Sequence, residues 1–315
     1  MKEFLSRRAK LQEWARSKLW YIQARELQRE GLKNAWVRRS IQHRILGTKP
    51  VPTETTGNCE VRVLTWRRDW VNCIWALKTF YAHSQKVFAL YIHDGGLLAW
   101  QAKELQKHFP NSHFIPSDEA DKQSLAALKA RGHCRSIAYR STNVSTKKLF
   151  DFYLLSNADR IISIDSDIVF FRPPIDLISP AGDTRTNLYN RDCMDLYAIS
   201  CNEIQQEFGL SVPPRVNSGL NSVWRDSIRF DSIEEWLKYP PLFSNRWVTE
   251  QTLHAMCSTV FGLSFLPPSY MVGTLPGLEP DVVCKHYPSE PRLWLYREGM
   301  PVAWRSLLNN QLDVA

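Results

Sequence analysis

The chain has 315 residues, of which 44% are hydrophobic and 12% aromatic, so it can bury the core of one large domain or two modest ones. Its seven cysteines form no C-x-x-C pair, which argues against zinc ribbons and against a disulfide framework. No stretch approaches the roughly 18 consecutive apolar residues of a membrane helix, and the first residues lack the apolar core of a signal peptide. We therefore expect a cytoplasmic protein.

The net charge of +8 is concentrated at one end of the chain. Residues 1–46 contain twelve Lys or Arg and four Glu, whereas residues 47–315 balance 28 basic against 28 acidic side chains. The body of the protein thus has no basic surplus with which to bind a phosphate backbone, and we expect no nucleic-acid partner.

Residues 1–46 are predicted to form a basic helical extension. They lack proline and place Leu11, Trp14, Leu19 and Ile22 at helical spacing. Such a segment either lies peripherally on an anionic membrane surface, at the inner face of a membrane, or packs as a helical hairpin on the body with its charges solvated. The sequence leaves both alternatives open.

Residues 47–58 are predicted to be a linker, and residues 59–315 to form one domain in which strand and helix patterns alternate. Strands are expected at 59–66, 86–96, 112–116 and 161–171, and helices at 69–83, 97–109, 121–131 and 145–158. This alternation is typical of an α/β domain, with a Rossmann-like, mostly parallel sheet flanked by helices.

The run IISIDSDIVFF, residues 161–171, carries two aspartates in a segment otherwise suited to burial. In a strand, Asp165 and Asp167 would point to one face and Ser166 to the other. A close pair of carboxylates either shares a proton or holds a cation, and ligands of open α/β sheets bind beyond the carboxyl ends of the strands. The pair therefore indicates a divalent metal site, unless the strand ends here and both aspartates are solvated in a turn.

Four segments resemble, in order, the motifs of GT-A fold glycosyltransferases and are most similar to those of family 8. The stretch KLFDFYLLSNADRIISIDSDIVFFRP resembles the metal-binding core, with Lys148 seventeen positions before Asp165. The family's F-N-[AS]-G strand, its [DE]-Q helix start and its late H-x-x-G-x-x-K-P-W segment are matched by residues 215–227, 247–256 and 284–296.

The resemblance spans residues 60–296 and implies a nucleotide-sugar transferase of the GT-A fold with the following site residues. The ligands of Mn²⁺ or Mg²⁺ would be Asp165, Asp167 and His286. The nucleotide and its phosphates would be contacted by Thr65, Lys148, Asp165, Ser166, Asp167 and Lys285. The residues near the transferred sugar would be Asn217, Glu250 and Gln251.

Two segments depart from the family pattern. In the late segment Ser289 replaces the glycine, and Lys-Pro-Trp becomes Arg292-Leu293-Trp294. Either Lys285 or Arg292 would then take the place of the lysine that approaches the diphosphate. The base-binding segment after the first strand, TWRRDW, is also weakly matched.

The sequence thus predicts a metal-dependent glycosyltransferase, of hexosyltransferase type, that moves a sugar from a UDP-sugar donor to a glycan, protein or small-molecule acceptor. Family 8 resemblance implies retention of configuration without a dedicated base. The alternative is a non-catalytic nucleotide-sugar or glycan-binding protein attached to a membrane surface. Phosphatases of the haloacid-dehalogenase type are disfavoured, because they usually have Thr or Ser where this chain has Val169.

Overall fold

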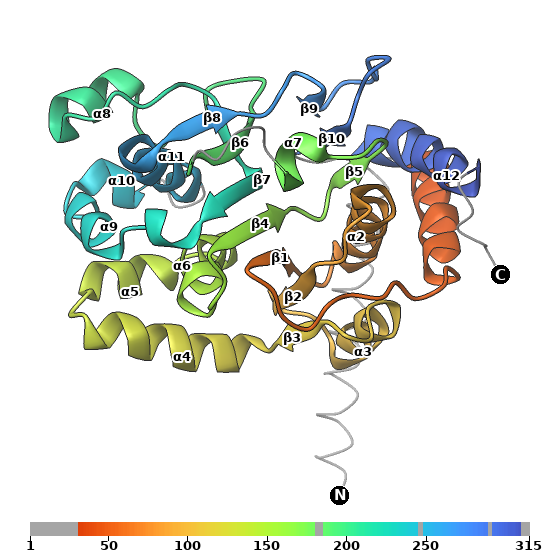
Figure 1. The fold of residues 1–315 in the computed structure, drawn as a ribbon, viewed down its shortest axis with the longest axis horizontal. Coiled ribbons are helices and arrows are strands. Elements are labelled where there is room, and N and C mark those ends of the chain that lie inside the picture. The colour runs from red at the N-terminus through yellow and green to blue at the C-terminus, as the bar shows by residue number, and fades with distance from the viewer. Residues whose placement is uncertain (1–30, 180–184, 245–247, 289–291, 310–315) are drawn as a thin grey trace, which may run out of the picture.

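The computed structural model describes residues 31–179, 185–244, 248–288 and 292–309, and a seven-stranded sheet runs through its middle (Figure 1). The strand order is β3–β2–β1–β4–β7–β6–β8, and only β7 runs antiparallel to its neighbours. The strands are β1 (Cys59–Thr65), β2 (Ala89–Asp94), β3 (His113–Ile115), β4 (Arg160–Ile164), β6 (Asn187–Arg191), β7 (Val216–Trp224) and β8 (Leu263–Phe265). The expected mostly parallel α/β sheet is confirmed.

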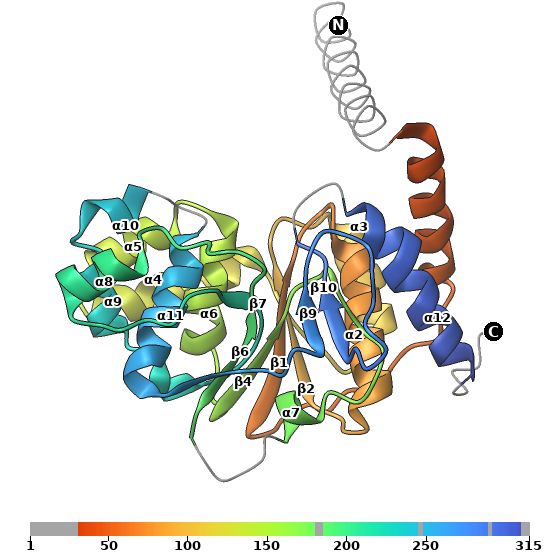
Figure 2. The ribbon, with the colours of Figure 1, turned by 90° about the horizontal axis from the view of Figure 1, so that it is seen from above.

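Helices cover both faces of this sheet (Figure 2). One face carries α2 (Trp70–Ser84), α3 (Ala99–His108) and α12 (Met300–Asn309), the last preceded by the π-helical turn η3 (Leu295–Gly299). The other carries α4 (Ser117–Ala130), α5 (Cys134–Arg140), α6 (Lys147–Leu154), α8 (Cys201–Phe208), α9 (Phe230–Trp236), α10 (Pro240–Ser244) and α11 (Thr249–Phe261). Shorter turns are η1 (Val144–Thr146), α7 (Ile175–Ile178) and η2 (Arg225–Ser227).

The central strands are apolar because both of their faces are covered. In β1 every residue after Cys59 is buried, and in β4 every residue after Arg160 is buried. Strands of parallel sheets with helices on both faces characteristically read as continuous apolar runs. This layering produces two apolar cores, one on each face of the sheet.

A second, smaller sheet lies on the α2 side, in the order β5–β10–β9. Its strands are β5 (Ile168–Phe170), β9 (Tyr270–Val272) and β10 (Cys284–His286). Antiparallel pairing with β5 sets His286 directly opposite Ile168. The late segment of the chain is thereby brought beside the two aspartates.

The prediction of one strand over residues 161–171 was wrong. β4 ends at Ile164, and Asp165, Ser166 and Asp167 form a turn that leads into β5. The chain turns here because it leaves the large sheet to pair with β10 in the small one. The alternation of faces within a strand therefore does not explain how the two aspartates are placed.

The described part of the N-terminal extension, residues 31–46, is a helix that packs beside α12 (Figure 2). Ile45 is fully buried in the core on that face, and Arg297 donates a hydrogen bond to Asn34. Residues 1–30 lie outside the described residues, so the membrane-surface hypothesis for residues 1–46 stays a prediction. Among the described helices, none combines the length and apolar character needed to cross a bilayer.

Candidate functional site

A cavity of about 490 Å³ opens at one edge of the large sheet. It is lined by residues at the carboxyl ends of β1, β4 and β6 and at the start of the antiparallel β7, among them Thr65, Asp165 and Asn217. The first turns of α6 and α11 add Lys148 and Glu250. This is the edge at which open α/β sheets bind ligands.

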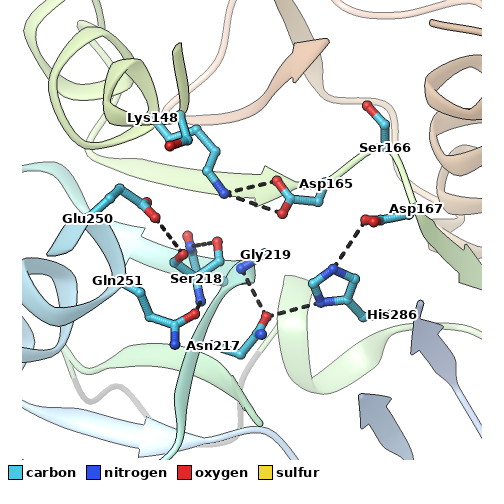
Figure 3. A network of polar contacts seen from close by, with 12 residues as sticks. Lys148, Asp165, Ser166, Asp167, Asn217, Ser218, Gly219, Glu250, Gln251 and His286 are labelled. Atoms are coloured by element: carbon cyan, nitrogen blue, oxygen red, sulfur yellow. Dashed lines mark hydrogen bonds and ion pairs between the residues drawn. The ribbon is translucent and has the colours of Figure 1, made fainter. Parts of the chain in front are cut away.

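Three side chains in the cavity form a group that fits a divalent cation. Ligand atoms of Asp165, Asp167 and His286 all lie within 4.8 Å of one another (Figure 3). Asp167 and His286 are buried, and Asp165 is half-buried. Two carboxylate oxygens with one imidazole nitrogen suit Mn²⁺ or Mg²⁺ better than Ca²⁺, which prefers oxygen ligands alone.

A bulge in β7 makes room for this group. Tyr189 of β6 lies opposite Asn221, but the next residue, Asn190, lies opposite Asn217, so the residues between them bulge out. Gly219 in this bulge accepts a hydrogen bond from the backbone N–H of Asp165, at 2.8 Å. A Cβ on Gly219 would lie 2.4 Å from Cε1 of His286, so only glycine fits. Bulges of this kind often re-aim side chains next to functional sites.

Positive side chains flank the two carboxylates. Nζ of Lys148 lies 3.0 Å from Oδ1 of Asp165. Nε of Arg292 donates to Oδ2 of Asp167 at 2.7 Å, and its Nη1 donates to Asp69 at 2.5 Å. Both cations line the cavity, each in contact with a carboxylate there.

The pKa values of the two carboxyls move in opposite directions. Burial raises the pKa of Asp165, and the charge of Asp167 adds to this, against the opposing effect of Lys148. Burial acts in the same direction on Asp167, but Arg292 and His286 together hold the pKa of that carboxyl well below its usual range. Asp167 is therefore the more acidic carboxyl of the pair.

Glu250 and Gln251 face the bulge of β7 from the start of α11 (Figure 3). Oε2 of Glu250 accepts from the Ser218 hydroxyl at 2.9 Å, and Oε1 of Gln251 accepts from the Ser218 backbone N–H at 3.3 Å. Burial alone would raise the pKa of Glu250, but Lys148 and His254, whose Nε2 lies 3.3 Å from Oε1, hold it below its usual value. The cavity thus presents an ionised, buried carboxylate on the side opposite the small sheet.

The remaining predicted residues also line the cavity. Thr65 ends β1, and its hydroxyl accepts a hydrogen bond from the Ser166 hydroxyl at 3.3 Å. Asn217 contacts His286, because its Oδ1 lies 3.1 Å from Nδ1 of that histidine. The motif resemblance assigns Asn217 to the donor sugar, whereas in the structure its side chain contacts His286 and Asp192.

Comparisons with solved structures identify the fold. No family model matches the chain, and no curated protein sequence matches it. Among solved structures, the apo form of mouse xyloside xylosyltransferase 1 is 14% identical, covers 75% of this chain and 98% of its own, and superposes with a TM-score of 0.51. The apo structure of the bifunctional glycosyltransferase WbbM is 13% identical over 81% of this chain and 51% of its own, with a TM-score of 0.53.

The chain has the GT-A fold. This confirms the fold expected from the motifs, and at such low identities the likeness concerns the fold alone. The chain spans about half the length of WbbM, so that protein contains a further part without a counterpart here.

Within this GT-A fold, Lys285 is not brought to the site. Its Nζ donates to the carbonyl oxygens of Leu275 and Gly277, each at 2.8 Å, and pairs with Glu298 at 3.1 Å. Lys285 directly precedes His286 on β10, and neighbours on a strand point to opposite faces. Since His286 faces the cavity, Lys285 faces away from it, and Arg292 is the cation of this segment that lines the cavity.

Two acidic residues of the GT-A cavity were missed by sequence reasoning. Asp69 precedes α2 and pairs with Arg292, and Asp192 follows β6. Each stands next to a strand or helix end at the ligand-binding edge. That position is the signal that could have found them, although no motif marks either residue.

Proposed function

We propose that this protein is a metal-dependent glycosyltransferase that moves a sugar from a UDP-sugar to a glycan, protein or small-molecule acceptor. The observation that carries the proposal is the group formed by Asp165, Asp167 and His286, whose ligand atoms lie within 4.8 Å of one another inside the cavity. The GT-A fold, found here and in two glycosyltransferases, supports it.

Asp165, Asp167 and His286 would hold Mn²⁺ or Mg²⁺. The cation, when bound, acts as a Lewis acid that stabilises the negative charge developing on the departing diphosphate. Lys148 and Arg292 would stabilise the same charge. Each contacts one of the two carboxylates that would hold the cation, so each would lie close to a diphosphate bound to that cation. These two side chains are fixed before the reaction, so little reorganisation is needed as the charge develops.

The opposite wall would contact the sugar. Cleavage of a sugar–phosphate bond leaves positive charge on the sugar ring, and the buried Glu250 carboxylate would stabilise that charge. Gln251 and Ser218 present side-chain polar groups that are suited to orient sugar hydroxyls. Retention follows from the motif resemblance, with the departing phosphate oxygen taking the proton of the acceptor.

The uracil would lie near the end of β1. Trp66 lines the cavity there, and 37% of the residue is exposed. A partly exposed indole offers a base a stacking surface, which is typically worth about 1–3 kcal/mol. The Thr65 and Ser166 hydroxyls lie at the same end of the cavity and would contact the nucleotide.

Turnover tests this proposal directly. The purified protein is incubated with a panel of UDP-sugars, with Mn²⁺ or with EDTA, and UDP release is measured. We expect release that requires Mn²⁺, is lost in Asp167→Ala, and is kept in Asp159→Ala, which changes an exposed aspartate at the opposite end of β4. UDP-sugar binding without any release or transfer would instead favour the non-catalytic binding protein.

A further inference from the structure

A chain of buried hydrogen bonds connects the metal-site histidine to Asp192. Nδ1 of His286 lies 3.1 Å from Oδ1 of Asn217, and Nδ2 of Asn217 donates to Oδ2 of Asp192 at 2.7 Å. Each of the three residues is at most 5% exposed. The sequence motifs assign no role to Asp192, and the reaction as described above does not use it.

The neighbours of Asn217 allow its amide only one orientation. The Asp192 carboxylate accepts hydrogen bonds, so the amide group that faces it must be the NH₂. The backbone N–H of Gly219 can only donate, and it lies 3.0 Å from the other end of the amide, Oδ1. The oxygen of the amide is therefore turned toward His286.

The amide in turn determines which imidazole nitrogen carries hydrogen. Since Oδ1 of Asn217 accepts only, Nδ1 of His286 must be the N–H that donates to it. Nε2 then faces the other way, and it lies 3.1 Å from Oδ1 of Asp167. A histidine that binds a metal does so through its unprotonated nitrogen, while the other ring N–H is held by a hydrogen-bond acceptor.

We propose that Asp192 is a positioning residue of the metal site. Acting through Asn217, it holds the His286 ring in the orientation and tautomer that direct Nε2 at the divalent cation. This inference rests on the proposed function, and it gives Asn217 the metal-site histidine as its principal partner. Loss of such an outer partner typically weakens metal binding about 10–100-fold.

The test is Mn²⁺ affinity without nucleotide, measured by titration calorimetry and by electron paramagnetic resonance of free Mn²⁺. We expect Asp192→Ala to bind Mn²⁺ about tenfold more weakly than wild type, or worse. Asp195→Ala is the matched control, because Asp195 belongs to the same loop, is exposed, and accepts from the Arg215 backbone N–H at 3.1 Å. It should bind Mn²⁺ as wild type does.

If Asp192→Ala does not fold, exchanging the side chains of Asp192 and Asn217 tests the same hydrogen bonds. Asn217→Asp alone sets two carboxylates against each other at a site where the present contact is 2.7 Å. Combining it with Asp192→Asn restores an amide that donates to a carboxylate, and the carboxylate still accepts from His286. The double variant should recover Mn²⁺ affinity to within about threefold of wild type, and Asn217→Asp alone should not.

Thermal denaturation without metal accompanies each titration, because a merely structural role lowers the melting temperature but leaves the Mn²⁺ affinity of the folded protein unchanged. Wild-type affinity in Asp192→Ala, or a double variant no better than Asn217→Asp, would overturn the inference. Failure of the proposed function looks different: wild type itself would not bind Mn²⁺, or would bind it regardless of Asp167→Ala.

Discussion

At the scale of single residues, the site is organised by how its buried charges are paired. Asp165 is paired with Lys148, and Asp167 with Arg292 and His286. Burying a carboxylate without a partner costs several kcal/mol, so these contacts allow both acids to stay in the cavity wall. A divalent cation bound by the two carboxylates would add to this positive charge. Lys148 and Arg292, which contact the same carboxylates, would then lie near the diphosphate of a bound donor.

Lys148→Met is expected to weaken UDP binding in the presence of Mn²⁺ by about tenfold, because it removes a charge-assisted contact to the phosphates. Lys147→Met supplies the matched control. Its ammonium contacts Ser117 at 2.6 Å and Asp121 at 3.0 Å, and it does not line the cavity. Calorimetry on both variants checks the prediction, and equal losses of affinity would contradict it.

Gly219→Ala is expected to abolish or strongly weaken metal-dependent UDP binding. The added methyl group would lie 2.4 Å from Cε1 of His286 and 2.9 Å from Oδ2 of Asp165, so both ligands must shift. Misplacement of about 1 Å is enough to cost roughly a hundredfold in function. Gly273→Ala is the control, since a Cβ there meets nothing within 4 Å. Calorimetry with Mn²⁺ and UDP should show normal binding only in the control.

At the scale of elements, the small sheet assembles the site from distant parts of the chain. β5 and β10 pair so that His286 lies opposite Ile168, directly after the two aspartates. The same strand directs Lys285 to its other face, where it closes the loop that carries Leu275 and Gly277. On β10, His286 thus belongs to the candidate cation site, whereas its neighbour Lys285 stabilises the loop.

Lys285→Met should therefore act on stability rather than on donor binding. The substitution leaves two carbonyl oxygens and Glu298 without their partner, and we expect the free energy of unfolding to fall by about 2 kcal/mol. Chemical denaturation measures this loss, and calorimetry should find Mn²⁺-dependent UDP binding unchanged in the folded variant. A stable variant with impaired UDP binding would show that Lys285 reaches the phosphates after all.

The alternating elements of the domain were predictable because their burial pattern is local. The apolar run predicted at residues 59–66 becomes β1, Cys59–Thr65, in which every residue after Cys59 is buried, and the helices between the strands keep helical spacing. The position of Lys285 was also predictable. Adjacent residues of a strand point to opposite faces, so if His286 faces the site, Lys285 faces away from it. The residues assigned from the motifs, with the exception of Lys285, line one cavity because strand ends and helix starts meet at one edge of the sheet.

The local sequence did not decide whether a turn forms at Asp165–Asp167. The apolar run continues through Ile168 to Phe171, so a continuous strand and a strand that ends at the aspartates remained as alternatives. The stop depends on pairing with β10, more than a hundred residues later. Asp192 and its contact to Asn217 were missed for the same reason, since the register of β6 on β7 is fixed by long-range pairing and the bulge.

At the scale of the whole molecule, both faces of the sheet are closed by apolar cores and the site lies at the edge between them. The N-terminal helix contributes to one of these cores through Ile45, with residues 31–46 lying beside α12. Because Ile45 is buried in this core, residues 31–46 are a component of the folded body. In the same helix, Leu32 is 75% exposed and Trp36 is 71% exposed.

The membrane-surface hypothesis is best tested on residues 1–30, which contain eight Lys or Arg and four Glu. Removing them should weaken binding to vesicles rich in anionic lipid and leave binding to neutral vesicles unchanged, because the attraction is electrostatic. Vesicle co-sedimentation of the full-length and truncated proteins measures this. Equal binding of the two proteins to anionic vesicles would refute the hypothesis.

The measurement that tests the central claim most directly is calorimetric titration of UDP into the protein, with and without Mn²⁺, in wild type and Asp167→Ala. The structure predicts binding that requires Mn²⁺ and is lost in the variant, because Asp167 and His286 together face the candidate cation site. UDP binding that is indifferent both to Mn²⁺ and to the substitution would contradict the account and leave the two aspartates as residues of a turn.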